Sequence, residues 1–190
     1  MTVLILGLLL FFGIHSVQIV APTLRERVIA RGGVGAWKWP YTAIAGIGLL
    51  LLIIGYDMAR HTAPILYYPH AGLRHAALLV MLPVFPLLLA TYIKGRIQQW
   101  LRHPMLIATI LWATAHLMAN GSLADLLLFS CFLLWALLDW RSVIVRGKSA
   151  TPDNRMPWGR NDAIAIIGGL AVYAVFIGGL HALLFGVSPI

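Results

Sequence analysis

Apolar residues gather into six long segments of the chain, separated by short polar or basic stretches. A helix that crosses a bilayer needs about 20 mainly apolar residues. Segments of about that length cover residues 2–20, 39–56, 71–93, 103–120, 123–140 and 162–187. We therefore predict an all-α, polytopic integral membrane protein, in which a six-helix bundle forms one transmembrane domain over residues 1–190.

Two local signals add detail to this pattern. Pro83 and Pro86 lie in the middle of the third segment, and because proline has no N–H to donate, we predict a kink there. The triplet Asn120, Gly121 and Ser122 is typical of a tight turn, so the fourth and fifth segments are expected to form a helical hairpin.

Basic side chains are distributed unevenly among the connections between the predicted spans. Short basic loops stay in the cytoplasm. Twelve of the 14 Lys and Arg residues lie in the first, third and fifth connections: Arg25, Arg27, Arg31, Lys38, Lys94, Arg96, Arg102, Arg141, Arg146, Lys148, Arg155 and Arg160. Only Arg60 and Arg74 lie on the other side, which predicts that both termini lie outside the cytoplasm. No basic residue precedes the first segment, so we expect a retained span and not a cleaved signal peptide.

Composition and charge exclude several classes of protein. Hydrophobic residues make up 61% of the chain and charged residues 11%, which excludes an ordinary soluble domain. Cys131 is the only cysteine, so an intramolecular disulfide is excluded. The net charge of +8 lies at the predicted membrane edges, so we expect the lipid bilayer as a partner and no nucleic acid.

Four of the seven histidines lie within predicted spans, each on a different span: His15, His75, His116 and His181. Ionisable residues at such depth are costly and often mark a functional site; a neutral histidine hydrogen-bonded between helices is the structural alternative. At a rise of about 1.5 Å per residue, His75, His116 and His181 share a level about 6–9 Å inside the outer boundary, whereas His15 lies about 20 Å from it. Asn120, one turn after His116, is expected to orient its imidazole.

The remaining histidines have simpler interpretations. His61 and His70 lie in the second connection and are expected at the surface. His103 stands at the start of the fourth span, where we expect a helix-start residue at headgroup level.

The scarcity of acids inside the spans restricts the cofactor. Asp57, Asp125 and Asp139 lie near span ends, which leaves no mid-membrane acid for a proton relay and weakens a transporter hypothesis. The HxxxH and HxxHH spacings of membrane di-iron sites are missing. Imidazoles from facing helices in an apolar pocket suit haem iron, and a b-type haem needs no CxxCH motif. Haem b is therefore the cofactor that we predict, and a helical membrane protein without a cofactor is the alternative.

The stretch from residue 103 to residue 141 combines the motifs HPM, LW, AHL, NG, LLF and WALLD. It resembles the NnrU family of bacterial membrane proteins, and the resemblance extends to the first-span histidine and to nearly the whole chain. The resemblance implies a link to denitrification, that is, to nitrite and nitric oxide metabolism. The family is similar to plant zeta-carotene isomerase, an integral membrane enzyme that carries haem b with histidine ligation.

The resemblance also implies roles for particular residues. His15 and His116 are the implied axial ligands of the haem iron, and His103 matches a further family position. Ala113 stands where the carotene enzyme carries a cysteine, which argues against a thiolate ligand and against isomerase activity. The depth estimate favours a different partner for His116, namely His75 or His181, which lie at its level.

Two functional hypotheses remain open at this point. The first is a haem b membrane protein, an enzyme or redox protein with isomerisation or nitrogen-oxide chemistry. The second is a non-catalytic accessory or assembly factor for respiratory nitrogen-oxide reductases, which would then be its protein partners in the membrane.

Overall fold

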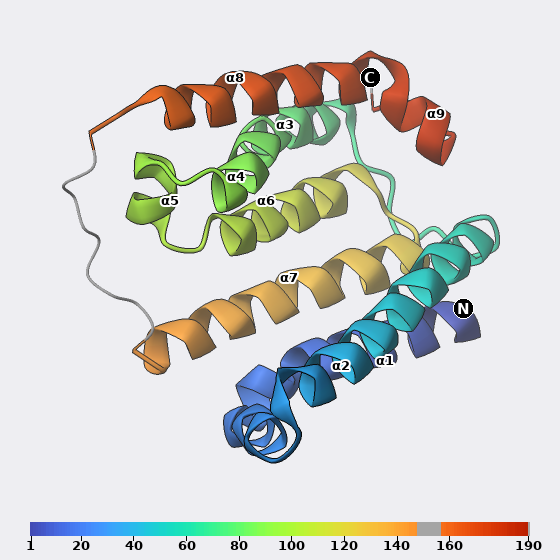
Figure 1. Cartoon of the computed structure of the whole chain (residues 1–190). Coiled ribbons are helices and arrows are strands. Elements are labelled where there is room, and N and C mark those ends of the chain that lie inside the picture. Colours follow the sequence, from blue (N-terminus) through green and yellow to red (C-terminus); the bar gives the residue numbers. More distant parts are fainter. Residues whose placement is uncertain (148–156, 190) are drawn as a thin grey trace. The chain divides into compact units, whose positions relative to one another are not determined.

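The computed structural model describes residues 1–147 and 157–189, and every regular element within these ranges is a helix (Figure 1). The fourth predicted span is the short apolar helix α6 (Pro104–Ala119). Lys148 and Arg155, two of the basic residues expected in the cytoplasm, lie outside the described residues. Five stretches are long and apolar enough to cross a membrane: α1 (Thr2–Val20), α2 (Pro22–Arg60), α3 with α4 (Ala71–Tyr92), α7 (Leu123–Val145) and α8 through α9 (Arg160–Phe185). An all-helical fold of membrane type is therefore confirmed.

The chain forms two compact units. The first unit comprises Met1–Tyr67 and Gly121–Asp139, and the second comprises Tyr68–Asn120 and Trp140–Ile190. Helix α7 begins in the first unit and ends in the second.

In the first unit, α1 and α2 pack against each other through glycines. A Cβ atom on Gly7 would lie 2.6 Å from the backbone nitrogen of Leu52, and one on Gly48 would lie 2.7 Å from that of Phe11. Because residue numbers rise along one helix as they fall along the other, the two helices are antiparallel. Small residues that allow backbones to approach are the usual basis of helix association in lipid.

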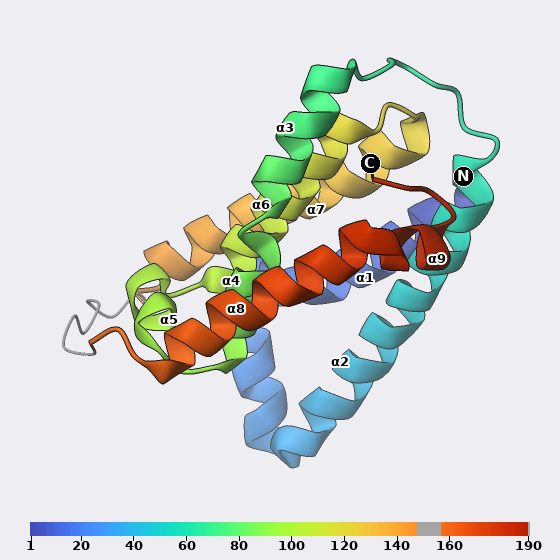
Figure 2. The same cartoon turned by 90° about the horizontal axis from the view of Figure 1, so that it is seen from above.

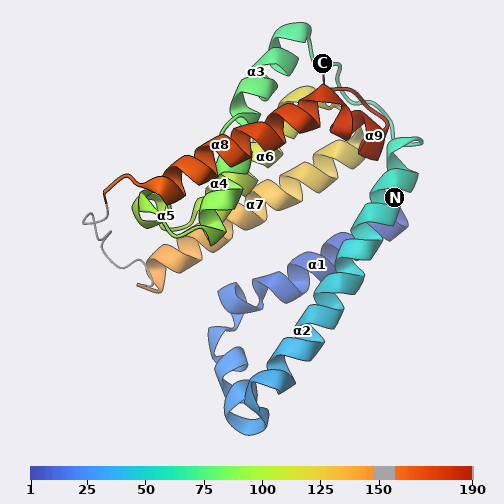
Figure 3. The ribbon, with the colours of Figure 1, turned by 45° about the horizontal axis from the view of Figure 1, so that its top comes forward.

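Helix α2 differs from the predicted second span because it begins at Pro22, and not at residue 39. Residues 22–38 carry arginines and a glutamate, which are good helix formers, and proline is tolerated in a first helical turn. Gly33 interrupts the helix with φ 75° and ψ 176°. Positive φ costs glycine little, and Figure 3 shows the two parts of α2 meeting at an angle. The basic residues expected in a loop here therefore stand on a helix.

The start of α7 is held by a buried acid. The Asp125 backbone nitrogen donates to Ser122 Oγ at 3.2 Å, and the Ser122 nitrogen donates to Asp125 Oδ2 at 3.0 Å. The Tyr56 hydroxyl donates to Asp125 Oδ1 at 2.5 Å and so ties α2 to α7. Ser122 and Asp125 therefore form a capping box at the start of α7, and Asp125 also joins α7 to α2.

In the second unit, the third predicted span is divided into α3 (Ala71–Met81) and α4 (Val84–Tyr92), so the predicted kink is confirmed. Leu82 donates its N–H to Leu79 at 3.3 Å, one residue short of the regular α-helical spacing. The carbonyl of Leu78 accepts from the Tyr173 hydroxyl of α8 (Arg160–Val175) at 2.7 Å. A side chain of another helix thus replaces the missing backbone donor. Helices α8 and α4 are in contact, and Figure 2 shows α8 crossing α4.

Helix α5 (Arg96–Leu101) lies in a connection where no helix was predicted. The Asp162 carboxylate at the start of α8 accepts from the backbone nitrogen of Ile97 at 2.8 Å and from that of Gly159 at 3.1 Å. One buried carboxylate therefore caps two helices that are distant in sequence.

The sixth predicted span changes from an α-helix to a π-helical turn before it ends. Helix α8 is followed by the π-helical turn η1 (Phe176–Leu180) and then by α9 (His181–Phe185). Gly179 within this turn has φ 146°, a conformation that residues with a Cβ rarely adopt. Such π turns frequently lie at functional sites, and His181 is the first residue after this one.

Candidate functional site

Two predicted site residues, His116 of α6 and His181 of α9, lie side by side in the second unit. Their ring centroids are 6.5 Å apart, and the ring planes make an angle of 33°. Both side chains are half-buried. The structure therefore brings together two of the three histidines that were expected at one membrane level.

Each of these rings is oriented by a backbone carbonyl. His116 Nδ1 lies 2.8 Å from the Trp112 oxygen, and His181 Nδ1 lies 2.7 Å from the Val187 oxygen. A carbonyl oxygen only accepts hydrogen bonds, so Nδ1 carries the proton, and in a neutral imidazole Nε2 then holds the lone pair. Metal-binding histidines are commonly oriented in this way, by a carbonyl at the ring nitrogen that does not bind the metal.

Asn120 acts on His116 through the backbone. Its side-chain amide and its backbone nitrogen each donate to the His116 carbonyl oxygen at 2.9 Å. The expected contact with the imidazole is therefore replaced by a contact with the main chain. Asn120 closes the end of α6, where the last carbonyls of a helix lack helical partners, and it positions His116 through that carbonyl.

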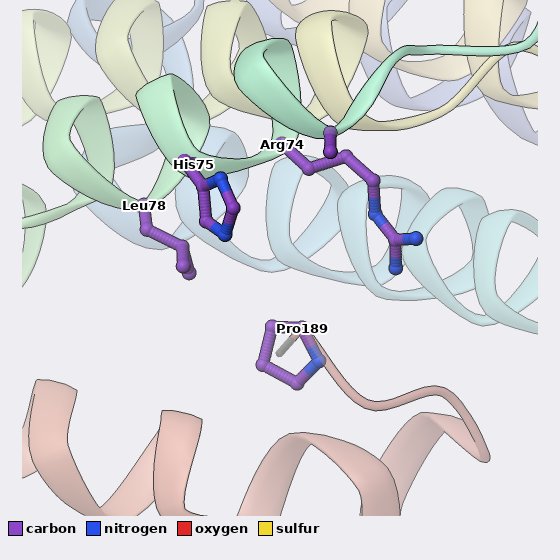
Figure 4. A pocket seen from close by; sticks show the side chains of 5 residues that line it. Arg74, His75, Leu78 and Pro189 are labelled. Carbon is purple, nitrogen blue, oxygen red and sulfur yellow. The ribbon is translucent and has the colours of Figure 1, made fainter.

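His75 lies in a different part of the second unit, at an open pocket. The pocket is lined by Ala71, Arg74, His75, Leu78 and Pro189. Figure 4 shows the side chains of Arg74, His75 and Leu78 projecting from α3 toward Pro189 of the C-terminal segment. A charged and an imidazole side chain therefore share this pocket with an otherwise apolar lining.

His15 lies in the first unit among aromatic side chains. Its Nδ1 is 2.6 Å from the Phe11 carbonyl oxygen, so this ring is oriented like the other two. It stacks on the Phe11 ring with centroids 4.1 Å apart, and its centroid lies 5.5 Å from Tyr41 and 5.8 Å from Trp135. The indole Nε1 of Trp135 is buried and has no hydrogen-bond partner among the described residues. The site thus presents an imidazole and an indole N–H within an aromatic wall.

The donor groups limit which metal centre the chain can hold. Within residues 1–147 and 157–189, no three His, Cys, Asp or Glu side chains gather closely enough to hold a bare metal ion. A porphyrin supplies four ligands of its own, so its iron needs only one or two histidines. The implied pairing of His15 with His116 joins residues of different units and stays a prediction.

A comparison with known families shows the family of this chain. The model of a family described as NnrU protein matches residues 3–189. The chain belongs to the NnrU family. No curated protein and no solved structure matches it.

In this NnrU-family protein, the surroundings of three polar side chains make them candidate site residues that the sequence did not predict. His103, interpreted as a helix-start residue, has a buried Nε2 without a hydrogen-bond partner in the described part of the chain. Trp135 stands beside His15, and Arg74 beside His75. Of the three, only Arg74 is unusual in the sequence itself, because it is one of two basic residues on the predicted outer side.

Proposed function

We propose that this NnrU-family protein is a multi-pass protein of the bacterial inner membrane that binds haem b through intramembrane histidines, with His116 as one axial ligand. The observation that carries the proposal is the pair of neighbouring imidazole rings, with centroids 6.5 Å apart and each with Nδ1 on a carbonyl oxygen. The role follows the family resemblance: redox or isomerisation chemistry linked to nitrite and nitric oxide metabolism.

The separation of the two rings suits one metal atom between them. A metal–imidazole bond is about 2 Å long, so two nitrogens on opposite sides of one atom are about 4 Å apart and the ring centroids about 6 Å apart. The distance of 6.5 Å between His116 and His181 is close to this value.

The second ligand has more than one candidate. His181 is supported by its place beside His116, and His15 by the family resemblance and by its aromatic surroundings. His75, the other alternative at that level, lies at the pocket with Arg74. The variants below separate these assignments.

The protein residues would set how the cofactor is held. The carbonyl oxygens of Trp112 and Val187 orient the two rings, and a hydrogen bond donated by Nδ1 raises the basicity of the ligating nitrogen. Haem iron, when bound, supplies one-electron and ligand-binding chemistry.

The proposed topology has six spans and periplasmic termini. Helix α6 has 16 residues and is therefore about 24 Å long. A hydrocarbon core is about 30 Å thick, so the polar ends of α6, with His103 and Asn120, would complete the crossing. The predicted outer side carries only two basic residues, Arg60 and Arg74, which supports the orientation.

Purification from haem-replete cells in mild detergent tests the haem proposal. We expect a Soret band and a pyridine haemochrome that corresponds to one haem per chain. The variant His116→Gly should lose the band and regain it when imidazole is added, which separates a lost ligand from misfolding. The surface control His70→Gly should keep the band.

The identity of the second ligand is tested with His181→Gly and His15→Gly in the same assay. The variant that lacks the true ligand should change from a low-spin to a high-spin spectrum and recover with imidazole. Folded but colourless wild-type protein would overturn the haem proposal and favour the accessory-factor hypothesis.

A further inference from the structure

The packing of α1 on α2 fixes the level at which the span of the first unit ends. Three glycines mark residues that face each other: Gly7 faces Leu52, Gly48 faces Phe11 and Gly55 faces Leu4. The residue numbers of each pair add up to 59, so Val20, the last residue of α1, is level with Trp39 of α2. Helix α1 has 19 residues and is about 28 Å long, close to the thickness of about 30 Å of a hydrocarbon core. Residues 22–38 therefore lie beyond the core.

Residues 22–38, here called the basic hairpin, leave this level and return to it. The first leg covers residues 22–32, Gly33 breaks the helix with φ 75°, and the second leg continues into the span (Figure 3). Gly33 comes six residues before Trp39, so the tip of the hairpin stands about 9 Å beyond the end of the span. The first leg is about 16 Å long, so it fits within that height only if it is inclined toward the membrane plane.

The height of the basic hairpin corresponds to the layer of lipid headgroups. A bilayer is about 40–45 Å thick and its hydrocarbon core about 30 Å, which leaves a polar layer of about 5–8 Å on each side. The inclined leg starts at the edge of the core and rises no more than about 9 Å. The phosphate groups of phospholipids lie at this height, so they are the first charged groups that the leg can meet.

Basic side chains dominate the surface of the basic hairpin. Its charged residues are Arg25, Glu26, Arg27, Arg31 and Lys38. The four basic side chains are exposed, and none of them forms an ion pair within the described part of the chain. An exposed arginine needs no partner by itself. Four cations concentrated at the height of lipid phosphates, however, are attracted together to an anionic membrane surface.

Apolar side chains beside these charges favour a membrane over a soluble partner. Leu24 is 42% exposed, Val34 63% and Trp39 72%. Segments that lie in a membrane interface combine basic residues with leucine and tryptophan in this way, because the apolar groups reach the acyl boundary while the charges stay among the headgroups. Charge and exposed apolar surface therefore point to the same occupant.

We infer that the basic hairpin is a binding surface for anionic phospholipid headgroups on the predicted cytoplasmic side, and that Arg25, Arg27 and Arg31 hold the phosphates. The inference goes beyond the proposed function and does not depend on it, because no residue of the hairpin is a candidate haem ligand.

Equilibrium titration of purified full-length protein with fluorescently labelled lipids tests this surface. Wild-type protein in detergent should bind anionic phosphatidylglycerol more tightly than zwitterionic phosphatidylcholine, and high salt should reduce the preference, because exposed charges are screened. In the triple variant Arg25→Gln, Arg27→Gln, Arg31→Gln, affinity for phosphatidylglycerol should fall about tenfold to a hundredfold, as expected for three basic residues near an anionic surface. Affinity for phosphatidylcholine should stay unchanged.

Two further variants separate a lost site from a misfolded hairpin and from a general effect of charge. Replacing the same three arginines by lysine keeps the charge, so most of the affinity for phosphatidylglycerol should remain. The matched control replaces three exposed basic residues of the other connections on the same predicted side: Lys94→Gln, Arg141→Gln and Arg160→Gln. This control should keep the preference for phosphatidylglycerol. Equal losses in both glutamine triples would overturn the hairpin as the site.

The height of the hairpin has a test of its own. A spin label on Val34→Cys, with Cys131→Ala to remove the native thiol, is measured by electron paramagnetic resonance in nanodiscs that contain phosphatidylglycerol. We expect the label at headgroup depth, and a label in bulk water would overturn the placement. If both lipids bind equally and polyglutamate binds through Arg25, Arg27 and Arg31, the surface belongs to an acidic protein segment and the inference fails.

Discussion

The imidazole ring of His181 lies 6.5 Å, centroid to centroid, from that of His116, although the two residues are on helices α9 and α6. A π-helical turn immediately before His181, and a helix that begins at Pro104 and is capped by Asn120, set the two positions. Because both rings donate from Nδ1 to carbonyl oxygens, they present the same nitrogen, Nε2, for ligation. This relationship is the main support for the proposed haem site.

The variant Gly179→Ala should disturb the approach of His181. Gly179 has φ 146°, a conformation that costs a residue with a Cβ about 1–3 kcal/mol. Thermal unfolding in detergent should show lower stability, and the Soret band of haem-loaded protein should shift. The neighbouring Gly178→Ala is the control, because its φ is ordinary and a Cβ there meets open space. Identical behaviour of the two variants would contradict the assigned turn.

The variant Gly48→Ala should weaken the packing of α1 on α2. Its Cβ would lie 2.7 Å from the backbone nitrogen of Phe11, which cannot move as a side chain does. Overpacking of this kind costs about 1–3 kcal/mol, to be measured as a lower unfolding midpoint in a denaturing detergent. Gly46→Ala, on the same helix with open space at the Cβ position, should change the midpoint little.

The variant Tyr173→Phe tests the repair of the proline kink. It removes the hydroxyl that donates to the Leu78 carbonyl at 2.7 Å and should cost about 1 kcal/mol of stability. Hydrogen exchange at the α3–α4 junction should also accelerate. Tyr92→Phe serves as the control, because Tyr92 is 76% exposed and has no hydroxyl contact among the described residues. Equal exchange in both variants would refute the role of Tyr173.

The variant Asp162→Ala should loosen α5 and the start of α8 together. It removes a buried carboxylate, 3% exposed, that accepts from backbone nitrogens of both segments. Loss of charged hydrogen bonds of this kind costs about 1.5–3 kcal/mol each. Limited proteolysis near residues 96–101 should speed up. Asp57→Ala, at a side chain that is 66% exposed, should leave stability and proteolysis nearly unchanged.

The orientation of the chain is tested with reporters. Alkaline phosphatase, which is active only in the periplasm, should be active when fused after Ile190 and inactive when fused after Gly147. Green fluorescent protein at the same two positions should give the opposite result. A fluorescent fusion after Ile190 would reverse the topology deduced from the basic residues.

Several features of the fold followed directly from the order of residues. Apolar runs predicted the helices because a lipid-embedded backbone must satisfy its own hydrogen bonds. Pro83 predicted the division between α3 and α4, because its missing N–H has the same effect in any surroundings. The resemblance of residues 103–141 to the NnrU family was confirmed by the match over residues 3–189. Helix α5 and the early start of α2 were not predicted, because in amphipathic connections the composition alone does not separate a helix from a loop.

The sequence by itself determined that this is a helical membrane protein with histidines inside its apolar segments, because hydrophobicity and charge act residue by residue. Only the tertiary structure decided that His181 meets His116, that Asn120 binds a carbonyl and not a ring, and that Arg74 opens onto a pocket. The physical reason is that depth follows from counting residues along one helix, whereas contact depends on how helices rotate and pack. A single π turn before His181 changes that rotation without a clear mark in the sequence.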